Sequence, residues 1–237
     1  MQTENGKKPT KRKLPLKIIF LVLIFFVIAL RVFVGEVCSV PSASMSPTIH
    51  IGDWLWIDKL TYGAQLPRRF ADIPIFNVFT WIKPLRLADA KNDWGYNRMA
   101  GFRMPRIGDM AVFESPEFPH PLLVKRIAAI FSEGDTIVVN AQNFDRMYPL
   151  VTNEGHSMIL INDSIYINGQ LDYLCIISQP YYYMLGDNSE NSHDSRMFGF
   201  VPYSSLVGRM NFVIFSIDPD THFFHSIRWN RFFKKIN

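Results

Sequence analysis

Cysteine is scarce in this sequence, which contains only Cys38 and Cys175. Two cysteines cannot build a disulfide scaffold, and their number is compatible either with one bridge in an oxidising compartment or with two free thiols. The chain has no Cys-x-x-Cys pair and no His-x-x-x-His cluster. Because zinc sites are usually built from such clusters, we expect no bound metal.

Nucleotide-binding signatures are also missing. The sequence contains neither a Gly-x-Gly-x-x-Gly loop nor a Walker loop, and no alternation of strands and helices, so we expect no nucleotide cofactor. The formal net charge is +4, but the basic residues crowd at the two ends of the chain and form no long basic stripe between them. This distribution argues against nucleic acid as a partner.

One long hydrophobic run is present, over residues 14–34, with charges only near its ends at Lys17 and Arg31. Its length is sufficient for a helix that crosses a hydrocarbon core of about 30 Å. Six basic residues lie at or before the start of the run, which predicts a cytoplasmic N-terminus. We therefore expect a cytoplasmic tail (residues 1–13), a membrane anchor (14–34) and an extracytoplasmic domain (35–237) at the cytoplasmic, or inner, membrane.

A removable signal peptide is the competing interpretation of the same run, because a basic segment followed by an apolar one is also typical of that signal. The residues that follow are Gly35, Glu36, Val37 and Cys38, which contain no small-x-small cleavage site. A lipoprotein signal is disfavoured because Val37 is large and Glu36 precedes it. The sequence therefore favours a retained anchor.

The rest of the chain has the pattern of a β protein. Short runs rich in Val, Ile, Phe and Tyr are separated by Gly-Asp and Asn-Gly turn signals, and this predicts strands at residues 54–58, 110–113, 136–140, 164–168 and 211–217. The expected fold is mostly antiparallel β.

Three stretches stand apart from this strand pattern. Residues 64–101 are rich in Pro, aromatic and basic residues and could rest on the bilayer or cap a substrate groove. Residues 143–183 form a polar and aromatic stretch between two of the segments that carry motifs. Residues 222–235 mix Phe, Trp and Arg, which suits either a lipid headgroup interface or a helix packed on the protein.

Three further segments carry candidate chemistry: residues 41–53 (PSASMSPTIHIGD), 124–126 (VKR) and 186–196 (GDNSENSHDSR). Each has an ordinary explanation when it is considered singly: a linker after a membrane span, a solvated basic pair and a turn. Their order behind an anchor is more specific. Together the four features resemble those of the bacterial type I signal peptidases, or leader peptidases, which are serine peptidases with a Ser-Lys dyad.

The resemblance implies a role for individual residues. Ser44, directly before Met45, matches the nucleophile, and Lys125 matches the general base. Ser42 matches the serine that completes the oxyanion hole with the backbone N–H of Ser44, and Ser192 matches a serine that orients the lysine. A supporting ion-pair network would comprise Arg126, Asp187, Asp194 and Arg196.

The resemblance also implies fold and substrate. The family fold has an antiparallel β catalytic core with a β-rich insertion, here residues 128–182. Its members release signal peptides from exported preproteins after small residues of the Ala-x-Ala type, without a cofactor. Shallow pockets for those residues would be lined by Val40, Met45, Ile49 and Val124. We expect the bilayer as a second partner and a monomeric enzyme.

The chemistry requires an uncharged lysine. A serine hydroxyl is a weak nucleophile until a base takes its proton. A solvated lysine has a pKa of about 10.4 and is charged at neutral pH, but burial disfavours the charged form and lowers that pKa. Apolar residues surround Lys125 in the sequence, at 121–124 and 127–130.

Two alternatives remain open on the sequence alone. A Ser-His-Asp hydrolase could use His50 or His193 with Asp194, although no Gly-x-Ser-x-Gly elbow exists and His193 is adjacent to Asp194. A non-catalytic, membrane-tethered β domain would leave Ser44 and Lys125 without a chemical role.

Overall fold

The computed structural model describes residues 15–117, 121–221 and 226–236. The expected basic tail (residues 1–13) and Leu14 of the expected span lie outside these ranges. The first element is helix α1 (Leu16–Ala29), which continues as the π-helical turn η1 (Leu30–Val34). Together they form one helix of 19 residues that is long and apolar enough to cross a membrane.

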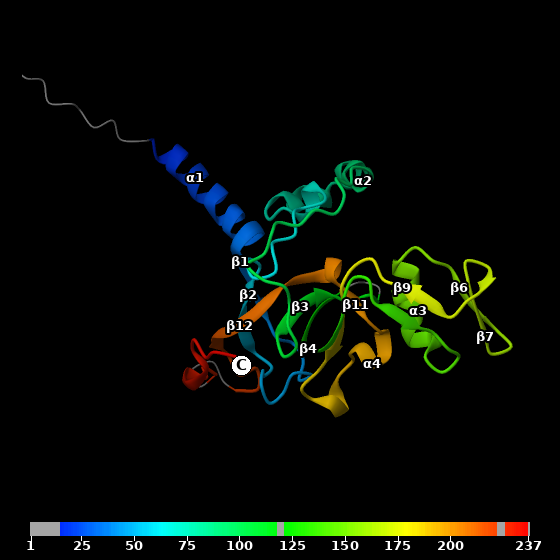
Figure 1. Cartoon of the computed structure of the whole chain (residues 1–237). Helices are drawn as coiled ribbons and strands as arrows, with labels where there is room; N and C mark the ends of the chain where they lie inside the picture. The colour runs from blue at the N-terminus through cyan, green and yellow to red at the C-terminus, as the bar shows by residue number, and fades with distance from the viewer. Residues whose placement is uncertain (1–14, 118–120, 222–225, 237) are drawn as a thin grey trace, which may run out of the picture.

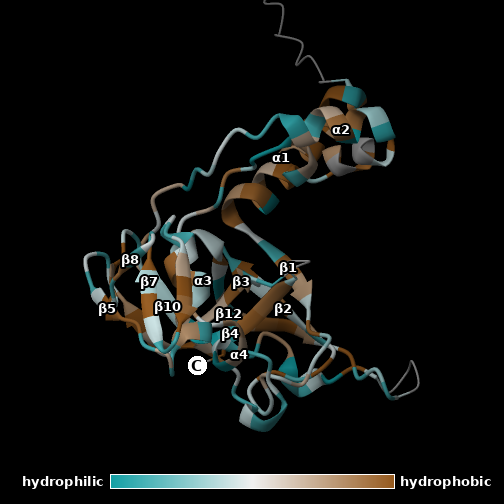
Figure 2. Cartoon of the chain, turned by 90° about the vertical axis from the view of Figure 1, so that its right-hand side faces the viewer, coloured by the Kyte–Doolittle hydropathy of each residue, from teal (hydrophilic) through white to brown (hydrophobic). Residues whose placement is uncertain are grey.

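Helix α1 projects from the rest of the protein as a separate rod (Figure 1), and nearly all of its residues are hydrophobic (Figure 2). None of its side chains is buried within the protein. An apolar helix with no buried side chain does not serve a protein core, so its exposed surface is suited to lipid.

The main body of the protein is an antiparallel sheet of seven strands in the order β1-β2-β12-β3-β4-β10-β11. The bounds of these strands are β1 Gly35–Ser39, β2 Asp53–Asp58, β3 Met110–Glu114, β4 Leu122–Phe131, β10 Tyr181–Leu185, β11 Val201–Pro202 and β12 Leu206–Ser216. The expected antiparallel β fold is confirmed. Apolar side chains of β1, β2, β3, β12 and the loop after β1 form one core cluster.

Two smaller sheets and a helix lie between β4 and β10 (Figure 1). Their elements are β5 Thr136–Val138, α3 Phe144–Asn153, β6 Met158–Ile161, β7 Ser164–Ile167, β8 Gln170–Leu171 and β9 Leu174–Ile176. The strand pattern gave no indication of α3. This helix forms because Met147, Leu150 and Val151 share one face and are buried in the core of this region, although Pro149 lies within the helix.

The sheet places β1 and β4 in the same direction, leading away from α1. Strand β1 begins directly after η1, and the N–H of Lys59 donates to the carbonyl of Val34 at 3.0 Å, so no loop separates the apolar helix from the sheet. Strand β10 pairs with β4 only from Arg126 onward. Within the described chain, residues 122–125 therefore pair with β3 on one side and with no strand on the other.

The segment at residues 64–101 is not a strand region. It contains the 3-10 helices η2 (Phe70–Asp72) and η3 (Phe76–Trp81) and the helix α2 (Lys83–Lys91). The remaining short elements are η4 Ser189–Asn191, α4 Ser195–Phe198, η5 Tyr203–Ser205 and η6 Trp229–Arg231.

The C-terminal segment matches neither expectation completely. Residues 222–225 lie outside the described ranges, and the described part contains only one 3-10 turn rather than a helix. Arg231 is buried and forms an ion pair with Asp53, while Trp229 and Phe233 are exposed. The segment is thus fastened to the start of β2 and still presents aromatic rings outward.

Candidate active site

Ser44 lies in the turn that connects β1 with β2. The N–H of Val40 donates to the carbonyl of Asp53 at 2.9 Å, and the N–H of Gly52 donates to the carbonyl of Val40 at 3.0 Å, so backbone hydrogen bonds join the two ends of the turn. Met45 and Ile49 are buried in the core. Because these two side chains hold the turn inward, Ser44 remains partly exposed at the surface.

Lys125 reaches Ser44 from the middle of β4. Its Nζ donates a hydrogen bond to Ser44 Oγ at 2.6 Å, although 81 residues separate the two in sequence. Lys125 is only 2% exposed. Burial lowers the pKa of Lys125; the carboxylate of Asp194 opposes this effect and Arg196 adds to it. The arrangement joins a hydroxyl to an amine whose neutral form is favoured, as proton transfer between them requires.

Ser42 and Ser192 both lie near the nucleophile, with different contacts. Ser42 Oγ is 3.4 Å from Ser44 Oγ. Ser192 Oγ is buried beside the Asp194 carboxylate, whose pKa it helps to lower, and the bond expected from it to Lys125 is absent among the described residues. The orienting role of Ser192 stays a prediction.

The four charged residues expected to support the site form two separate ion pairs. Arg126 binds Asp187 through two hydrogen bonds of 2.8 Å each. Arg196 binds Asp194, whose oxygen also accepts the N–H of Gly186 at 3.0 Å. Although burial opposes ionisation, Arg196 and this N–H hold the pKa of Asp194 well below its usual range.

Three positioning residues were missed by the sequence argument. The N–H of Asn188 donates to the carbonyl of Ser44 at 3.0 Å, and its side chain donates to the carbonyl of Ala43 at 3.2 Å. Thr48 donates to Asp187 at 2.5 Å. A Cβ added to Gly186 would lie 2.1 Å from Ser192 Oγ and 2.6 Å from the carbonyl oxygen of Ser44.

All three missed residues belong to the segments that carry the resemblance, which was the only available signal. Their function depends on contact between the turn after β1 and the loop after β10, more than 130 residues apart. No local pattern encodes such a contact.

The four residues expected to line substrate pockets come together in one cluster. Val40, Met45 and Ile49 are buried in it, and Val124 packs against it while partly exposed. Their role in substrate selection stays a prediction.

Neither histidine of the alternative hydrolase contacts the serine. The Nε2 of His193 pairs with the carboxylate of Glu117 at 2.6 Å, and the hydrogen bonds of His50 to Asp53 run from its backbone N–H and to its backbone carbonyl. Within the described chain, the hydrogen-bond partners of Ser44 Oγ are Lys125 and Ser42. The geometry therefore favours lysine as the base.

The cysteines are separate in the fold. Cys38 is on β1 and Cys175 is buried on β9, and both thiols are free. Among the described residues, no group of three metal-ligating side chains is found.

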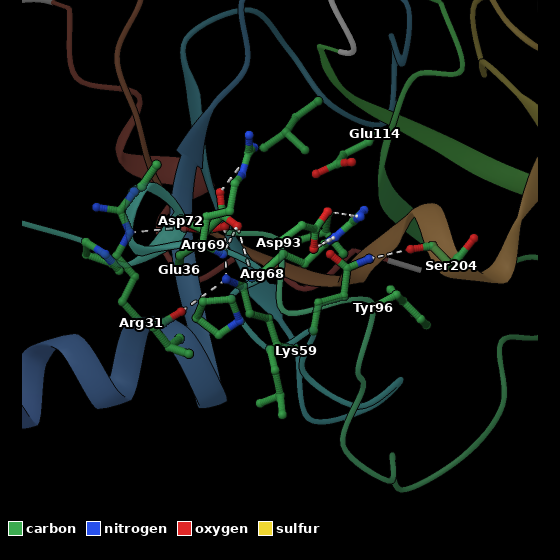
Figure 3. A pocket seen from close by; sticks show the side chains of 18 residues that line it. Arg31, Glu36, Lys59, Arg68, Arg69, Asp72, Asp93, Tyr96, Glu114 and Ser204 are labelled. Atoms are coloured by element: carbon green, nitrogen blue, oxygen red, sulfur yellow. Dashed lines mark hydrogen bonds and ion pairs between the residues drawn. The ribbon is translucent and has the colours of Figure 1, made fainter. Parts of the chain in front are cut away.

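A polar cleft of about 580 Å³ lies apart from the Ser44–Lys125 pair (Figure 3). It is lined by Arg31 at the end of the apolar helix, by Lys59 after β2, and by Glu114 and Leu122 at the adjoining ends of β3 and β4. From the 64–101 segment it is lined by residues 65–69, 71, 72, 74, 93 and 96. The Arg68 side chain pairs with Asp93 across part of this cleft. The cleft therefore lies where the apolar helix, the sheet and the 64–101 segment meet.

Comparisons with known proteins find that this chain is similar to signal peptidases. The family model described as "Signal peptidase, peptidase S26" matches residues 13–215. The chain is similar to Signal peptidase I of Buchnera aphidicola subsp. Schizaphis graminum, with 27% identity over 78% of this chain and 69% of that protein. It is also similar to Signal peptidase I of Pseudomonas aeruginosa (27% identity; 85% and 72% coverage) and of Helicobacter pylori strain J99 (26% identity; 90% and 89% coverage).

Proposed function

The chain belongs to the signal peptidase family, peptidase S26, and is therefore a serine endopeptidase, and we propose that it releases signal peptides from exported preproteins with Ser44 as nucleophile and neutral Lys125 as general base. The observation that carries this proposal is the hydrogen bond of 2.6 Å between Lys125 Nζ and Ser44 Oγ, formed where the lysine is almost completely buried.

In the first half of the proposed reaction, neutral Lys125 accepts the proton of Ser44 as Oγ bonds to the carbonyl carbon of the precursor. The negative oxygen that results is stabilised by the Ser44 N–H and the Ser42 hydroxyl. The C–N bond then breaks, Lys125 returns the proton to the leaving amine, and the signal peptide remains attached to Ser44 as an acyl ester.

In the second half, Lys125 accepts a proton from a water molecule as the water oxygen bonds to the ester carbon. The ester C–O bond breaks, Ser44 regains a proton from Lys125, and the signal peptide leaves with a free carboxylate. Lysine ends the cycle neutral, as it began.

The free edge of β4 supports the choice of an extended peptide as substrate. Residues 122–125 present backbone N–H and carbonyl groups on the side that β10 leaves uncovered. An extended precursor can add to such an edge as a further strand, and pockets beside the edge then select its side chains. We propose that Val40, Met45, Ile49 and Val124 leave room only for small residues of the Ala-x-Ala type.

Helix α1 supports a membrane location. We propose that it spans the cytoplasmic membrane once, with the N-terminus in the cytoplasm, the sheet outside and the enzyme acting as a monomer. Strand β1 follows directly after the helix, so Ser44 would lie close to the surface from which precursors emerge.

The proposal is tested by incubating the purified full-length chain, in detergent, with a precursor that bears an Ala-x-Ala site. Ser44→Ala should abolish cleavage, whereas Ser42→Ala should lower kcat by about 10²–10³-fold, the usual cost of one oxyanion donor. Gln in place of both His50 and His193 should leave cleavage intact. An active Ser44→Ala variant, or wild-type protein that leaves the precursor uncut, would contradict the proposal.

A further inference from the structure

Residues 66–97 form a unit, here called the excursion, that stands away from the catalytic sheet. Its helix α2 packs mainly against η2 and η3, which belong to the same unit, and no side chain of α2 is buried. Figures 1 and 2 both place α2 on the side of the sheet from which α1 projects. The excursion thus contributes little to the catalytic core.

The base of the excursion is a short antiparallel stalk. The N–H of Leu66 donates to the carbonyl of Asn97 at 2.9 Å, and the N–H of Trp94 donates to that of Arg68 at 2.9 Å. The side chains of Arg68 and Asp93 form an ion pair beside the stalk. Both ends of the excursion are therefore held together before the chain returns to the sheet.

Two side chains fasten this stalk to the sheet. Gln65 donates to the carbonyls of Ser204 and Leu206 at 2.6 and 3.0 Å. Arg98 also donates to the carbonyl of Leu206, and its guanidinium lies 4.7 Å from the ring centre of Tyr203. These bonds fix the direction in which the excursion leaves the sheet.

The tip is ordered as well. The carboxylate of Asp89, on α2, accepts the N–H groups of Phe70 and Ala71 at 3.0 and 3.1 Å. The ring of Phe70 meets that of Trp94 edge-on at 4.8 Å. These contacts hold η2 and the end of α2 together, and α2 also packs against η3, so the excursion is a folded structure up to its tip.

The surface of the excursion is strongly apolar. Exposed large hydrophobic side chains of the excursion are Phe70, Ile75, Phe76, Val78, Trp81, Ile82, Leu85, Leu87, Trp94 and Tyr96. Trp81 is 86% exposed, and the basic residues Lys83 and Arg86 follow it in the sequence. The surfaces of soluble proteins rarely expose so many large apolar side chains in one region. Tryptophan next to basic residues is typical of segments that lie at a lipid headgroup interface.

The position of the cleft in Figure 3 indicates which surface the excursion meets. Its walls combine Arg31 and Val32, at the outer end of the apolar helix, with Pro67 and Arg68 at the base of the stalk. A helix of 19 residues is about 28 Å long, close to the thickness of a hydrocarbon core of about 30 Å. The charged cleft consequently lies near headgroup height, and the excursion extends from it on the side of α1.

We propose that the excursion is a second membrane contact, whose tip at residues 75–87 lies in the interfacial layer of the bilayer that α1 spans. The proposal rests on the membrane location of α1 and is independent of the peptidase chemistry. Two contacts at separate points would fix the inclination of the sheet, and hence the direction in which the free edge of β4 faces the bilayer.

Site-directed spin labels on the full-length chain, reconstituted in vesicles of phosphatidylethanolamine and phosphatidylglycerol, test this proposal. Labels replace Trp81, Leu85, Leu23 in α1 and the control Leu171, which is 70% exposed on β8, in a background without Cys38 and Cys175. Labels at 81 and 85 should collide readily with oxygen and be protected from a water-soluble nickel chelate, as at Leu23. The label at 171 should be open to the chelate.

Several outcomes would overturn the proposal. Tip labels as open to the chelate as the label at 171 would place the tip in water. Tip labels shielded from both reagents would show that protein covers the tip, either a second copy or the rim of the substrate groove. If the label at 23 were open to the chelate, the membrane location of α1 itself would fail.

A second measurement needs no cysteine substitution. Lipids brominated near the headgroup should quench the tryptophan fluorescence of the unmodified chain more than that of Trp81→Phe. Equal quenching of the two would contradict the proposal. As a functional counterpart, Trp81→Asp with Leu85→Asp should slow cleavage of a membrane-embedded precursor but not of a short soluble peptide, whereas Leu171→Asp should affect neither.

Discussion

Replacement of Lys125 by Met tests the central chemical claim. The substitution keeps the length of the side chain and removes the amine. Lys125 is 2% exposed and its pKa is lowered by burial, so at neutral pH the folded protein is less stable by the free-energy cost of that lowered pKa. We expect Lys125→Met to be at least as stable as the wild type and inactive.

The magnitude follows from proton linkage. Between the lowered pKa of the folded state and about 10.4, the unfolded chain binds the lysine proton and the folded protein does not. Wild-type stability should therefore rise with pH through this window by about 1.36 kcal/mol per pH unit from this residue, and the variant lacks that slope. The stability gained by Lys125→Met relative to the wild type is greatest below the pKa that Lys125 has in the folded protein, and it shrinks as pH approaches about 10.4. Loss of the Lys125–Ser44 hydrogen bond reduces this gain in stability by about 0.5–1.5 kcal/mol.

The assay is denaturant unfolding of the full chain in detergent, followed by tryptophan fluorescence, at several values between pH 6 and pH 10. Lys234→Met is a suitable control because Lys234 is exposed. A variant that is less stable than wild type by an amount that does not change with pH would mean that Lys125 is a charged structural residue. The proposed base would then be refuted.

Further predictions concern the positioning residues. Gly186→Ala would place a Cβ 2.6 Å from the Ser44 carbonyl oxygen, so Ser44 must move by several tenths of an ångström to restore a contact of about 3.4 Å. We expect kcat to fall by up to about 10²-fold with folding retained. An unchanged kcat would contradict this expectation. Arg231→Met would leave the buried carboxylate of Asp53 without its ion-pair partner, and denaturant unfolding should show a loss of about 3–5 kcal/mol; a loss below 1 kcal/mol would mean that water replaces the arginine.

The sequence predicted the parts of the structure that depend on local patterns. The apolar helix follows from one hydrophobic run of 19 residues, and the antiparallel strands follow from short runs between turn signals. The pairing of Ser44 with Lys125 was implied only by the family resemblance of two motifs that are 81 residues apart. Contacts between distant segments could not be predicted in the same way. The bond from Asn188 to Ser44 and the ion pair of Arg231 with Asp53 join segments that no spacing relates.

Two elements show how tertiary packing determines structure that local signals obscure. Pro149 disfavours a helix, yet α3 forms because Met147, Leu150 and Val151 gain burial on one face. The composition of residues 64–101 distinguished this segment from the strand regions, but its helices were not predicted. Their order depends on contacts of Asp89 and of the stalk, which join residues distant in sequence.

The direct junction between the membrane helix and β1 has a mechanical consequence. Gly35 fits closely against β2, where an added Cβ would lie 2.4 Å from the carbonyl oxygen of Ile57, and Gly35 itself already pairs with Asp58 in the sheet. Ser44 follows Gly35 by nine residues, which reach at most about 30 Å when fully extended. With α1 in the bilayer as proposed, the Ser44 hydroxyl would stand at a fixed distance from the bilayer surface, and a precursor would be cut only where its scissile bond reaches that distance.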